Sequence, residues 1–208
     1  MPEISLFETI RTQRSIRRFT TEPVSDETIK TILEAAIRAP SPGNRQPWYF
    51  LVIRDRETKQ RLGDWYLDSW KATIGMDDPD IEKLPQAYRL GGELGQKMAD
   101  IPVVILACVE IGAGWAGPHD ITDGASIYPA VQNLLLAARS LGLGTVLTTM
   151  HRRYEAEIKE FLGIPENVIT TALIPLGYPG EGQRFGGSKR KPLNEVAFYD
   201  RWGRGKTG

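Results

Sequence analysis

The sequence predicts an α+β domain in which a small sheet is flanked by helices. Apolar residues recur at helical spacing in several segments, and four short apolar runs between them have the length and composition of strands. No Gly-x-Gly-x-x-Gly stretch follows the first run, and no acidic residue stands where a dinucleotide fold needs one. A doubly wound dinucleotide-binding domain is therefore disfavoured.

The first helix is predicted from a capping signal. Ser5 and Glu8 have the Ser-x-x-Glu spacing of a capping box, and the apolar residues that follow suggest a short helix ending near Arg14. Residues 16–20 then suggest an extended segment. Ser25 is the expected N-cap of a second helix, because apolar residues repeat at helical spacing until Pro40 stops it.

The middle of the chain begins with a rigid loop and a strand. The loop of residues 40–47 is rich in Pro, Gly and Asn, and it leads into the apolar run 48–53, which is typical of a strand. The less regular stretch 57–100 suggests helical pieces, with residues 61–99 forming a lid-like excursion from a single domain that spans 1–208. A second buried strand is expected at 102–109.

The remaining elements complete the predicted sheet. A long, nearly all-apolar helix is expected at 123–141, either in the core or at a subunit interface, and Gly142 and Gly144 close it. A strand at 145–149, a helix at 154–162 and a strand at 168–176 follow. A Gly-rich segment then leads to a C-terminal arm at 189–208.

Composition excludes several classes of protein. The 26 basic residues balance 26 acidic ones in a chain of 208 residues, so no overall field attracts nucleic acid or an anionic membrane. His119 and His151 are far apart and lack Cys or His partners at ligand spacing, so no metal site is predicted. The start lacks the pattern of a signal peptide and no apolar stretch approaches membrane-spanning length, which favours a cytoplasmic protein.

Four segments combine cations, hydroxyls or amides with chain-bending residues, although each has an ordinary structural explanation. Residues 13–19 could be a solvated helix end, and residues 40–48 could be turn chemistry before a core Trp. Residues 145–149 could reflect the β-propensity of Thr, and the basic triplet 189–191 could be a solvated tail. A functional interpretation needs the four together.

Together they resemble the flavin-dependent nitroreductase family, in the same order and at similar separations. The matching stretches are Arg14-Ser15-Ile16-Arg17-Arg18-Phe19, Ala39-Pro40-Ser41 with Asn44-Arg45-Gln46-Pro47-Trp48, Leu141-Gly142-Leu143-Gly144, Ile174-Pro175-Leu176-Gly177-Tyr178-Pro179 and Lys189-Arg190-Lys191-Pro192-Leu193. The strand end at Thr148-Thr149 and the basic tail look most like the iodotyrosine deiodinase branch. The resemblance implies a nitroreductase-like fold, a small mixed sheet flanked by helices, in an intertwined homodimer with active sites at the subunit interface.

The resemblance also implies FMN as cofactor and NADH or NADPH as electron donor. FMN carries a phosphate dianion and a ring edge that gains negative charge on reduction, so it needs cations at two separated points with small polar groups between them. The residues implied to bind it are Arg14, Ser15 and Arg190 at the phosphate, Arg17 at the ribityl chain and pyrimidine edge, Ser41, Pro42, Asn44 and Gln46 along the ring of the partner subunit's flavin, and Leu147, Thr148, Thr149 and Gly177 as hydroxyl and backbone contacts. Gln13 departs from the family, which usually has Arg there, so the phosphate would depend more on Arg14, Arg190 and Lys189.

The implied reaction moves electrons to a small acceptor, such as a nitroaromatic or a quinone, by a ping-pong mechanism on one open face of the ring. The catalytic proton donor is left unassigned. Tyr66, Trp70 and Tyr88 are candidates to stack on a flat substrate, and the alternative for each is a place in the core. A specialised dehalogenase or flavin-cleaving enzyme, and a non-catalytic flavin-binding protein, remain alternative functions.

The C-terminal arm supports the homodimer. Residues 196–202 are too apolar to trail in water, yet no place in the chain's own core is apparent for them. We expect them to reach onto a partner, with packing on their own subunit as the alternative.

Overall fold

The computed structural model describes residues 4–112, 122 and 124–203. Its helices are α1 (Leu6–Thr12), α2 (Asp26–Ala36), α3 (Arg56–Ile74), α4 (Gln86–Gln96), α5 (Gly124–Ser140) and α6 (Glu155–Leu162). Its strands are β1 (Trp48–Ile53), β2 (Val103–Glu110), β3 (Gly144–Thr145) and β4 (Val168–Gly177). The predicted α+β class is confirmed.

The predicted caps begin the first two helices. The Ser5 side chain accepts a hydrogen bond from the backbone N–H of Glu8, and the Ser25 side chain accepts one from Thr28. The Glu8 carboxylate does not complete a capping box, because it pairs with Arg11 instead. In α3 the Asp55 side chain has the same capping role, and Gly75 closes the helix in the left-handed conformation.

The sheet has the order β1-β2-β4-β3, and all neighbouring strands pair antiparallel. The predicted third strand is shorter than expected, because regular pairing covers Gly144 and Thr145 and then resumes as a single bridge from Thr148 to Leu173. The sheet of the four named strands is therefore antiparallel rather than mixed, and the parallel contact beside it is an isolated bridge between Ser15 and Thr145.

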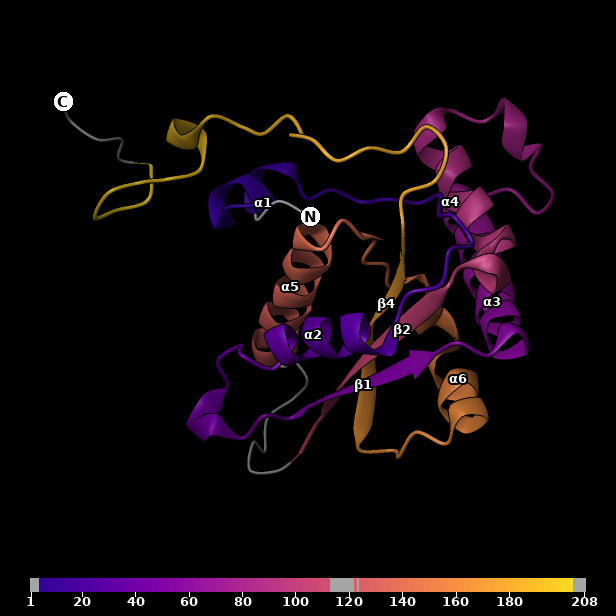
Figure 1. The fold of residues 1–208 in the computed structure, drawn as a ribbon, viewed down its shortest axis with the longest axis horizontal. Helices are drawn as coiled ribbons and strands as arrows, with labels where there is room; N and C mark the ends of the chain where they lie inside the picture. Colours follow the sequence, from indigo (N-terminus) through magenta and orange to yellow (C-terminus); the bar gives the residue numbers. More distant parts are fainter. Residues whose placement is uncertain (1–3, 113–121, 123, 204–208) are drawn as a thin grey trace.

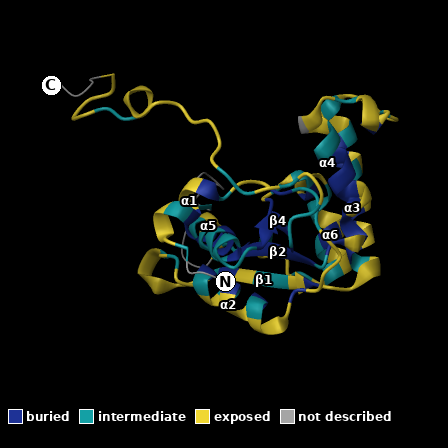
Figure 2. Cartoon of the chain, turned by 45° about the horizontal axis from the view of Figure 1, so that its top comes forward, coloured by how far each residue is buried: buried dark blue, intermediate teal, exposed yellow. Residues whose placement is uncertain are grey.

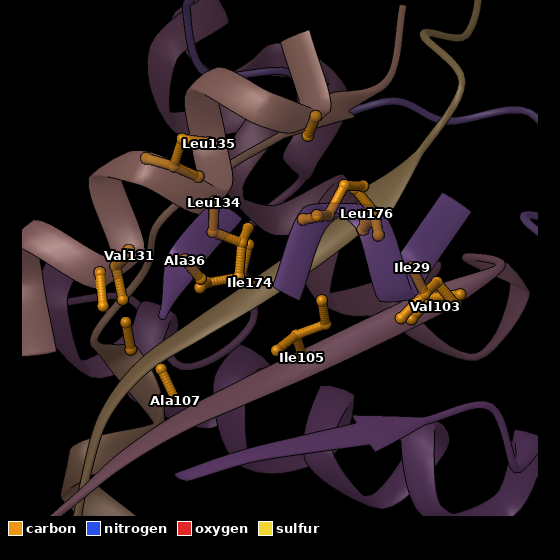
Figure 3. Packing of buried hydrophobic residues seen from close by; sticks show 14 of the residues in the cluster. Ile29, Ala36, Val103, Ile105, Ala107, Val131, Leu134, Leu135, Ile174 and Leu176 are labelled. Carbon is orange, nitrogen blue, oxygen red and sulfur yellow. The ribbon is translucent and has the colours of Figure 1, made fainter. Parts of the chain in front are cut away.

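Helices cover both faces of the sheet, with α2 and α5 on one side and α3, α4 and α6 on the other (Figure 1). The central strand β2 shows how this divides the core. Its alternate residues Val103, Ile105 and Ala107 join the aliphatic cluster beneath α2 and α5, part of which Figure 3 shows. The intervening Leu106 and Cys108 join the second cluster, beneath the excursion.

The long helix α5 packs its buried side chains against α2 and the sheet. Pro129 lies near its start, in a helix whose described part begins at Gly124. Unlike α5, the C-terminal arm extends away from the body of the molecule, and most of its residues are exposed (Figure 2). Leu193, Val196 and Trp202 are exposed, and the described part of the arm has only a ring contact between Phe198 and Trp202 to organise its aromatic residues.

Candidate functional site

The basic segment, residues 14–19, lies along the β3 end of the sheet. The N–H of Ile16 donates to the carbonyl of Thr145 at 2.9 Å, and the N–H of Thr20 donates to the carbonyl of Tyr178 at 3.0 Å. Its two ends are thus held by the ends of β3 and β4. The segment brings its arginines to the place where both strands stop.

Two glycines allow this close approach. A Cβ on Gly144 would lie 2.7 Å from the buried Ile16 side chain, which is closer than real side chains pack. A Cβ on Gly177 would lie 3.0 Å from Pro102 and 3.3 Å from Phe19. Gly177 is expected to spare a bound ring from collision, and the structure gives it a second reason, because it makes room for Phe19 of the basic segment.

The chain after β4 returns to the same segment. The N–H of Gly180 donates to the carbonyl of Arg18 at 2.8 Å, and the N–H of Arg17 donates to the Gln183 side-chain carbonyl at 3.0 Å. Further on, the N–H of Gly186 donates to the carbonyl of Thr12 at 3.0 Å. The start of the C-terminal segment therefore runs beside the basic segment.

The arginines of this region differ in their partners. The guanidinium of Arg18 makes a two-pronged ion pair with Glu93 of α4, at 2.6 Å and 2.8 Å. That pair lowers the pKa of the nearly buried Glu93 carboxyl, chiefly through the hydrogen bond from Arg18. Within the described residues, Arg14, Arg17 and Arg190 have no acidic partner. These three cations are available to an anionic ligand.

Tyr66 of α3 is buried, with 3% of its surface exposed. Burial raises the pKa of its hydroxyl, and the charge of Arg17 and the side chain of Thr148 oppose that rise. Tyr66 is therefore a neutral hydroxyl within range of the charge of Arg17.

The strand end offers both side chains and backbone groups. Thr148 exchanges two backbone hydrogen bonds with Leu173, at 3.0 Å and 2.9 Å, and its side chain accepts one from the N–H of Met150. The side chains of Leu147 and Thr149 are exposed on either side of it. Leu147, Thr148 and Thr149 thus present one apolar and two hydroxyl side chains at this strand end.

The predicted loop residues lie away from the basic segment in the folded chain. Pro42–Asn44 forms a short 3-10 turn, at the lower left of Figure 1. This turn follows the C-terminal end of α2, whereas the basic segment precedes the N-terminal end of the same helix. Because α2 has eleven residues, its ends are about 16 Å apart. Within one subunit, the structure does not bring Ser41, Pro42, Asn44 or Gln46 to the arginines.

The loop itself is strained and ordered by its own side chains. Asn44 and Gln46 have φ values of 56° and 51°, in the left-handed region that costs a non-glycine residue free energy. The Ser41 side chain accepts a hydrogen bond from the N–H of Gln46 at 3.0 Å, and the Gln46 amide donates to the Asn44 side chain at 3.2 Å. These bonds hold an exposed loop in one conformation.

The aromatic residues of the excursion are placed differently from one another. Trp70 is 4% exposed and packs against Gly91 and Gly92 of α4, where a Cβ would collide with its ring. Tyr66 is also buried, so for both residues a place in the core is favoured over a role in stacking on a substrate. Tyr88 is 51% exposed, and of the three candidates it alone presents its ring to solvent.

Sequence reasoning missed four positions around the site. The residues that contact the basic segment or its neighbours are Gln183, Glu93, Arg139 and Phe185. No local pattern indicates them, because their partners are distant in sequence. Glu93 lies 75 residues from Arg18, and Gln183 lies 166 residues from Arg17. A fifth residue, His151, follows the predicted strand end. It is fully buried, neither ring nitrogen has a hydrogen-bond partner among the described residues, and burial lowers its pKa to about 4.

The described part of the chain offers neither a metal site, a membrane span nor a reactive thiol. No three His, Cys, Asp or Glu side chains stand together as metal ligands there. None of the described helices is both long and apolar enough to span a lipid bilayer. The buried Cys108 thiol has its pKa raised to about 12, mainly by burial, so it is not a reactive nucleophile.

The site is thus one that offers unpaired cations and hydroxyls at the end of a small antiparallel sheet. The chain belongs to the nitroreductase family, whose model matches residues 10–178. A protein of Archaeoglobus fulgidus, provisionally named NADH dehydrogenase/NAD(P)H nitroreductase, is 34% identical over 85% of this chain and 86% of its own length.

Deiodinases are also among the relatives. Iodotyrosine deiodinase 1 of Rattus norvegicus is 28% identical over 91% of this chain and 67% of its own length. The crystal structure of an oxidised iodotyrosine deiodinase bound to FMN and 3-iodo-L-tyrosine superposes with a TM-score of 0.67 at 25% identity, covering 95% of this chain and 99% of that one. The predicted family is confirmed, and both of its named branches are represented.

Proposed function

We propose that this protein is an FMN-dependent oxidoreductase that moves electrons from NADH or NADPH to a small acceptor such as a nitroaromatic or a quinone. Membership of the nitroreductase family supports oxidoreductase activity in general. The observation that carries the specific proposal is the set of three arginines, Arg14, Arg17 and Arg190, which lack acidic partners in the described chain and belong to segments that run side by side.

The phosphate of FMN is assigned to Arg14, Ser15 and Arg190. Arg14 and Arg190 are both exposed, and among the described residues the Arg190 guanidinium has a hydrogen bond only to the neighbouring carbonyl of Lys189. A phosphate dianion satisfies such cations through charge-assisted hydrogen bonds. The backbone N–H of Gln13 donates to the carbonyl of Thr9 and closes α1, immediately before Arg14.

The flavin ring is assigned to the neighbourhood of Arg17. When bound, FMN would accept a hydride from the nicotinamide and return electrons to the acceptor. Arg17 would stabilise negative charge at the pyrimidine edge, and Thr148, Thr149, Leu147 and Gly177 would supply hydroxyl, apolar and backbone contacts. The anchored backbone of Arg17, held by Gln183, gives that cation a defined position.

A second subunit is needed to bring the remaining residues to the ring. The loop bearing Ser41, Pro42, Asn44 and Gln46 is displaced by the length of α2 from the basic segment of its own chain, so we infer that it serves the flavin of a partner subunit. Exposed apolar side chains on α1 and on the arm support a homodimer, because Phe7 is 82% and Trp202 is 92% exposed. A partner would cover both.

The donor and the acceptor would use one open face of the ring in turn, which gives ping-pong kinetics. Tyr88 is the candidate to stack on a flat acceptor, because its ring is exposed on α4. Tyr66 and Trp70 would support that surface from the core.

The second candidate function is a specialised dehalogenase, which the deiodinase relatives favour. It would use the same cofactor but fail to turn over nitroaromatics and quinones. A flavin-cleaving enzyme would also share FMN, and a non-catalytic flavin-binding protein would be yellow without reduction by a nicotinamide.

An absorbance spectrum of the purified protein, followed by anaerobic addition of NADH and NADPH, tests the proposal. We expect a yellow dimer with one FMN per subunit that is bleached by at least one donor and reoxidised by a quinone. A colourless protein that cannot be reconstituted with FMN overturns the proposal. Bleaching without reoxidation by quinones or nitroaromatics favours the specialised relatives instead.

Two arginine variants test the assignments within the site. Arg17→Ala should lower the midpoint potential of bound FMN by more than it weakens binding of the oxidised form, because reduction adds charge at the edge that Arg17 faces. Arg14→Ala should weaken binding without moving the potential, because the charge of the phosphate is the same in both redox states. An unchanged potential in Arg17→Ala would remove Arg17 from the ring.

A further inference from the structure

Three segments that are distant in sequence meet at Thr12, the last residue of α1. Thr12 is 5% exposed, and its hydroxyl donates to the carbonyl of Glu8 at 2.7 Å. The same hydroxyl accepts a hydrogen bond from Nε of Arg139 at 3.0 Å. The Thr12 carbonyl accepts from the N–H of Gly186 at 3.0 Å. The hydroxyl of Thr12 thus bonds to α1 and α5, and its carbonyl bonds to the segment that follows β4.

Arg139 is the side chain that connects the parts. It stands in the last turn of α5, where a helix favours a cation, and its guanidinium carbon lies 4.1 Å from the centre of the Phe185 ring. One face of the guanidinium thus covers Phe185 while its Nε holds Thr12. Both Arg139 and Phe185 are half-buried, and no described acidic side chain forms an ion pair with Arg139.

The two segments that Arg139 joins lead directly to the cations of the site. Arg14 follows Thr12 by two residues, and Arg190 follows Phe185 by five. Five residues span at most about 17 Å when fully extended, so fixing Phe185 limits how far Arg190 can lie from Arg14. Without the contact between Arg139 and Phe185, the hydrogen bond from Gly186 to Thr12 would be the one described hydrogen bond that holds the segment after Arg184 beside α1.

We propose that Arg139 is a positioning residue that brings Arg14 and Arg190 to the same phosphate, through Thr12 on one side and Phe185 on the other. This inference rests on the FMN function proposed above. Arg139 need not touch the cofactor. It orders the two segments before FMN binds, so that binding costs less conformational entropy.

The first test compares FMN with riboflavin, which lacks the phosphate. The variants are Arg139→Met, Phe185→Leu and the double variant. The matched control is Arg61→Met, which removes an arginine whose guanidinium lies 4.6 Å from the ring of Trp65, on α3. We expect about a tenfold loss of FMN affinity in the first two variants, unchanged riboflavin affinity, and no effect of the control. The double variant should lose no more than Arg139→Met alone, because the contact that Phe185→Leu weakens already requires the guanidinium of Arg139.

Each outcome has a distinct meaning. A wild-type protein that binds neither flavin overturns the proposed function and the inference together. A wild-type protein that binds FMN, with variants that keep full FMN affinity or lose both flavins equally, overturns the inference alone.

The second test needs no flavin. Trypsin cleaves after Arg184, which adjoins Phe185, and after Lys189 and Arg190 in the exposed arm. In the apoprotein, Arg139→Met and Phe185→Leu should speed cleavage after Arg184, while cleavage after Lys189 and Arg190 serves as the internal reference. Circular dichroism shows whether each variant is folded. Unchanged cleavage after Arg184 in folded variants would mean that Arg139 does not anchor this segment, and the inference would fail.

Discussion

The two faces of the sheet carry different kinds of core. The cluster beneath α2 and α5 is almost wholly aliphatic, and Trp48 is the one aromatic residue among its buried members in the described chain. The cluster beneath α3, α4 and α6 contains Trp65, Tyr66 and Trp70, and the buried Lys59, Glu93 and His151 lie on this side. The first face stabilises the fold, while the second face adjoins the candidate site and contains costly polar groups.

The unsatisfied atoms show the same division. Within the described chain, the buried side-chain nitrogens and oxygens without a hydrogen-bond partner belong to Ser69, Arg89 and His151. All three residues lie on α3, on α4 or in the turn that packs against α3. Buried polar groups that lack partners destabilise a fold, and they concentrate where function requires polar chemistry.

The largest effect is expected from the aliphatic face. Leu134→Ala removes a fully buried side chain of α5 and should lower the free energy of unfolding by about 4 kcal/mol, because it leaves a cavity against the sheet. Denaturant unfolding measures this. Any bound flavin should keep its midpoint potential, and a loss below about 1 kcal/mol would show that this face is not the rigid one.

The next effect is a pH dependence on the opposite face. His151 has a pKa of about 4 in the folded protein and an ordinary value of 6.5. Burial is the main cause, the charge of Arg152 adds to it, and the Thr170 backbone opposes it in part. The unfolded chain therefore binds more protons between these values, so stability falls as pH drops from 6.5 to 4, by up to about 3 kcal/mol.

His151→Gln should remove that pH dependence, since glutamine does not titrate. The comparison is the slope of unfolding free energy against pH between 4.5 and 6.5 in the two proteins, not their absolute stabilities. Parallel slopes in the wild type and the variant would mean that His151 is accessible to protons in the folded state.

A smaller effect is expected from Glu93→Gln, which leaves the Arg18 and Arg89 cations near each other without a counter-charge. We expect a loss of about 2 kcal/mol at neutral pH, discounted because a third of the Arg18 side chain is exposed. The pKa of Glu93 is lowered by Arg18, so its contribution is complete above the ordinary value of 4.5 and disappears as pH falls below it. A difference that persists undiminished in acid would indicate a packing effect.

The smallest effect distinguishes core from site. Tyr66→Phe keeps the buried ring and removes the hydroxyl that interacts with Thr148, so it should cost about 1 kcal/mol of stability. Acceptor KM should change little if the ring belongs to the core. A large rise in KM with unchanged stability would return Tyr66 to the substrate surface.

The sequence predicted the elements whose signals are local. Ser25 and the periodic apolar residues of α2 locate that helix, and the apolar run 48–53 coincides with β1. It overestimated the strand beginning at Thr145, because β-propensity does not reveal that regular pairing there stops after two residues.

The candidate site was predicted by motif rather than by contact. The segments that bear Arg14, Ser15, Arg17, Thr148 and Gly177 come together, which no single segment could show. The partners of the basic segment, such as Glu93 and Gln183, could not be predicted, because an ion pair or a side-chain hydrogen bond between distant residues leaves no spacing in the sequence. Burial of Trp70 also depends on Gly91 and Gly92, whose fit beneath its ring requires the folded α3–α4 pair.

The hydrogen bonds of the basic segment limit how early the site can form during synthesis. Residues 15–20 are synthesised before their hydrogen-bond partners, which are Thr145, Tyr178, Gly180 and Gln183. A nascent chain can therefore form α1 and α2 long before it can fix Arg17 in place. The backbone contacts that place Arg17 can therefore form only after Gln183 has been synthesised.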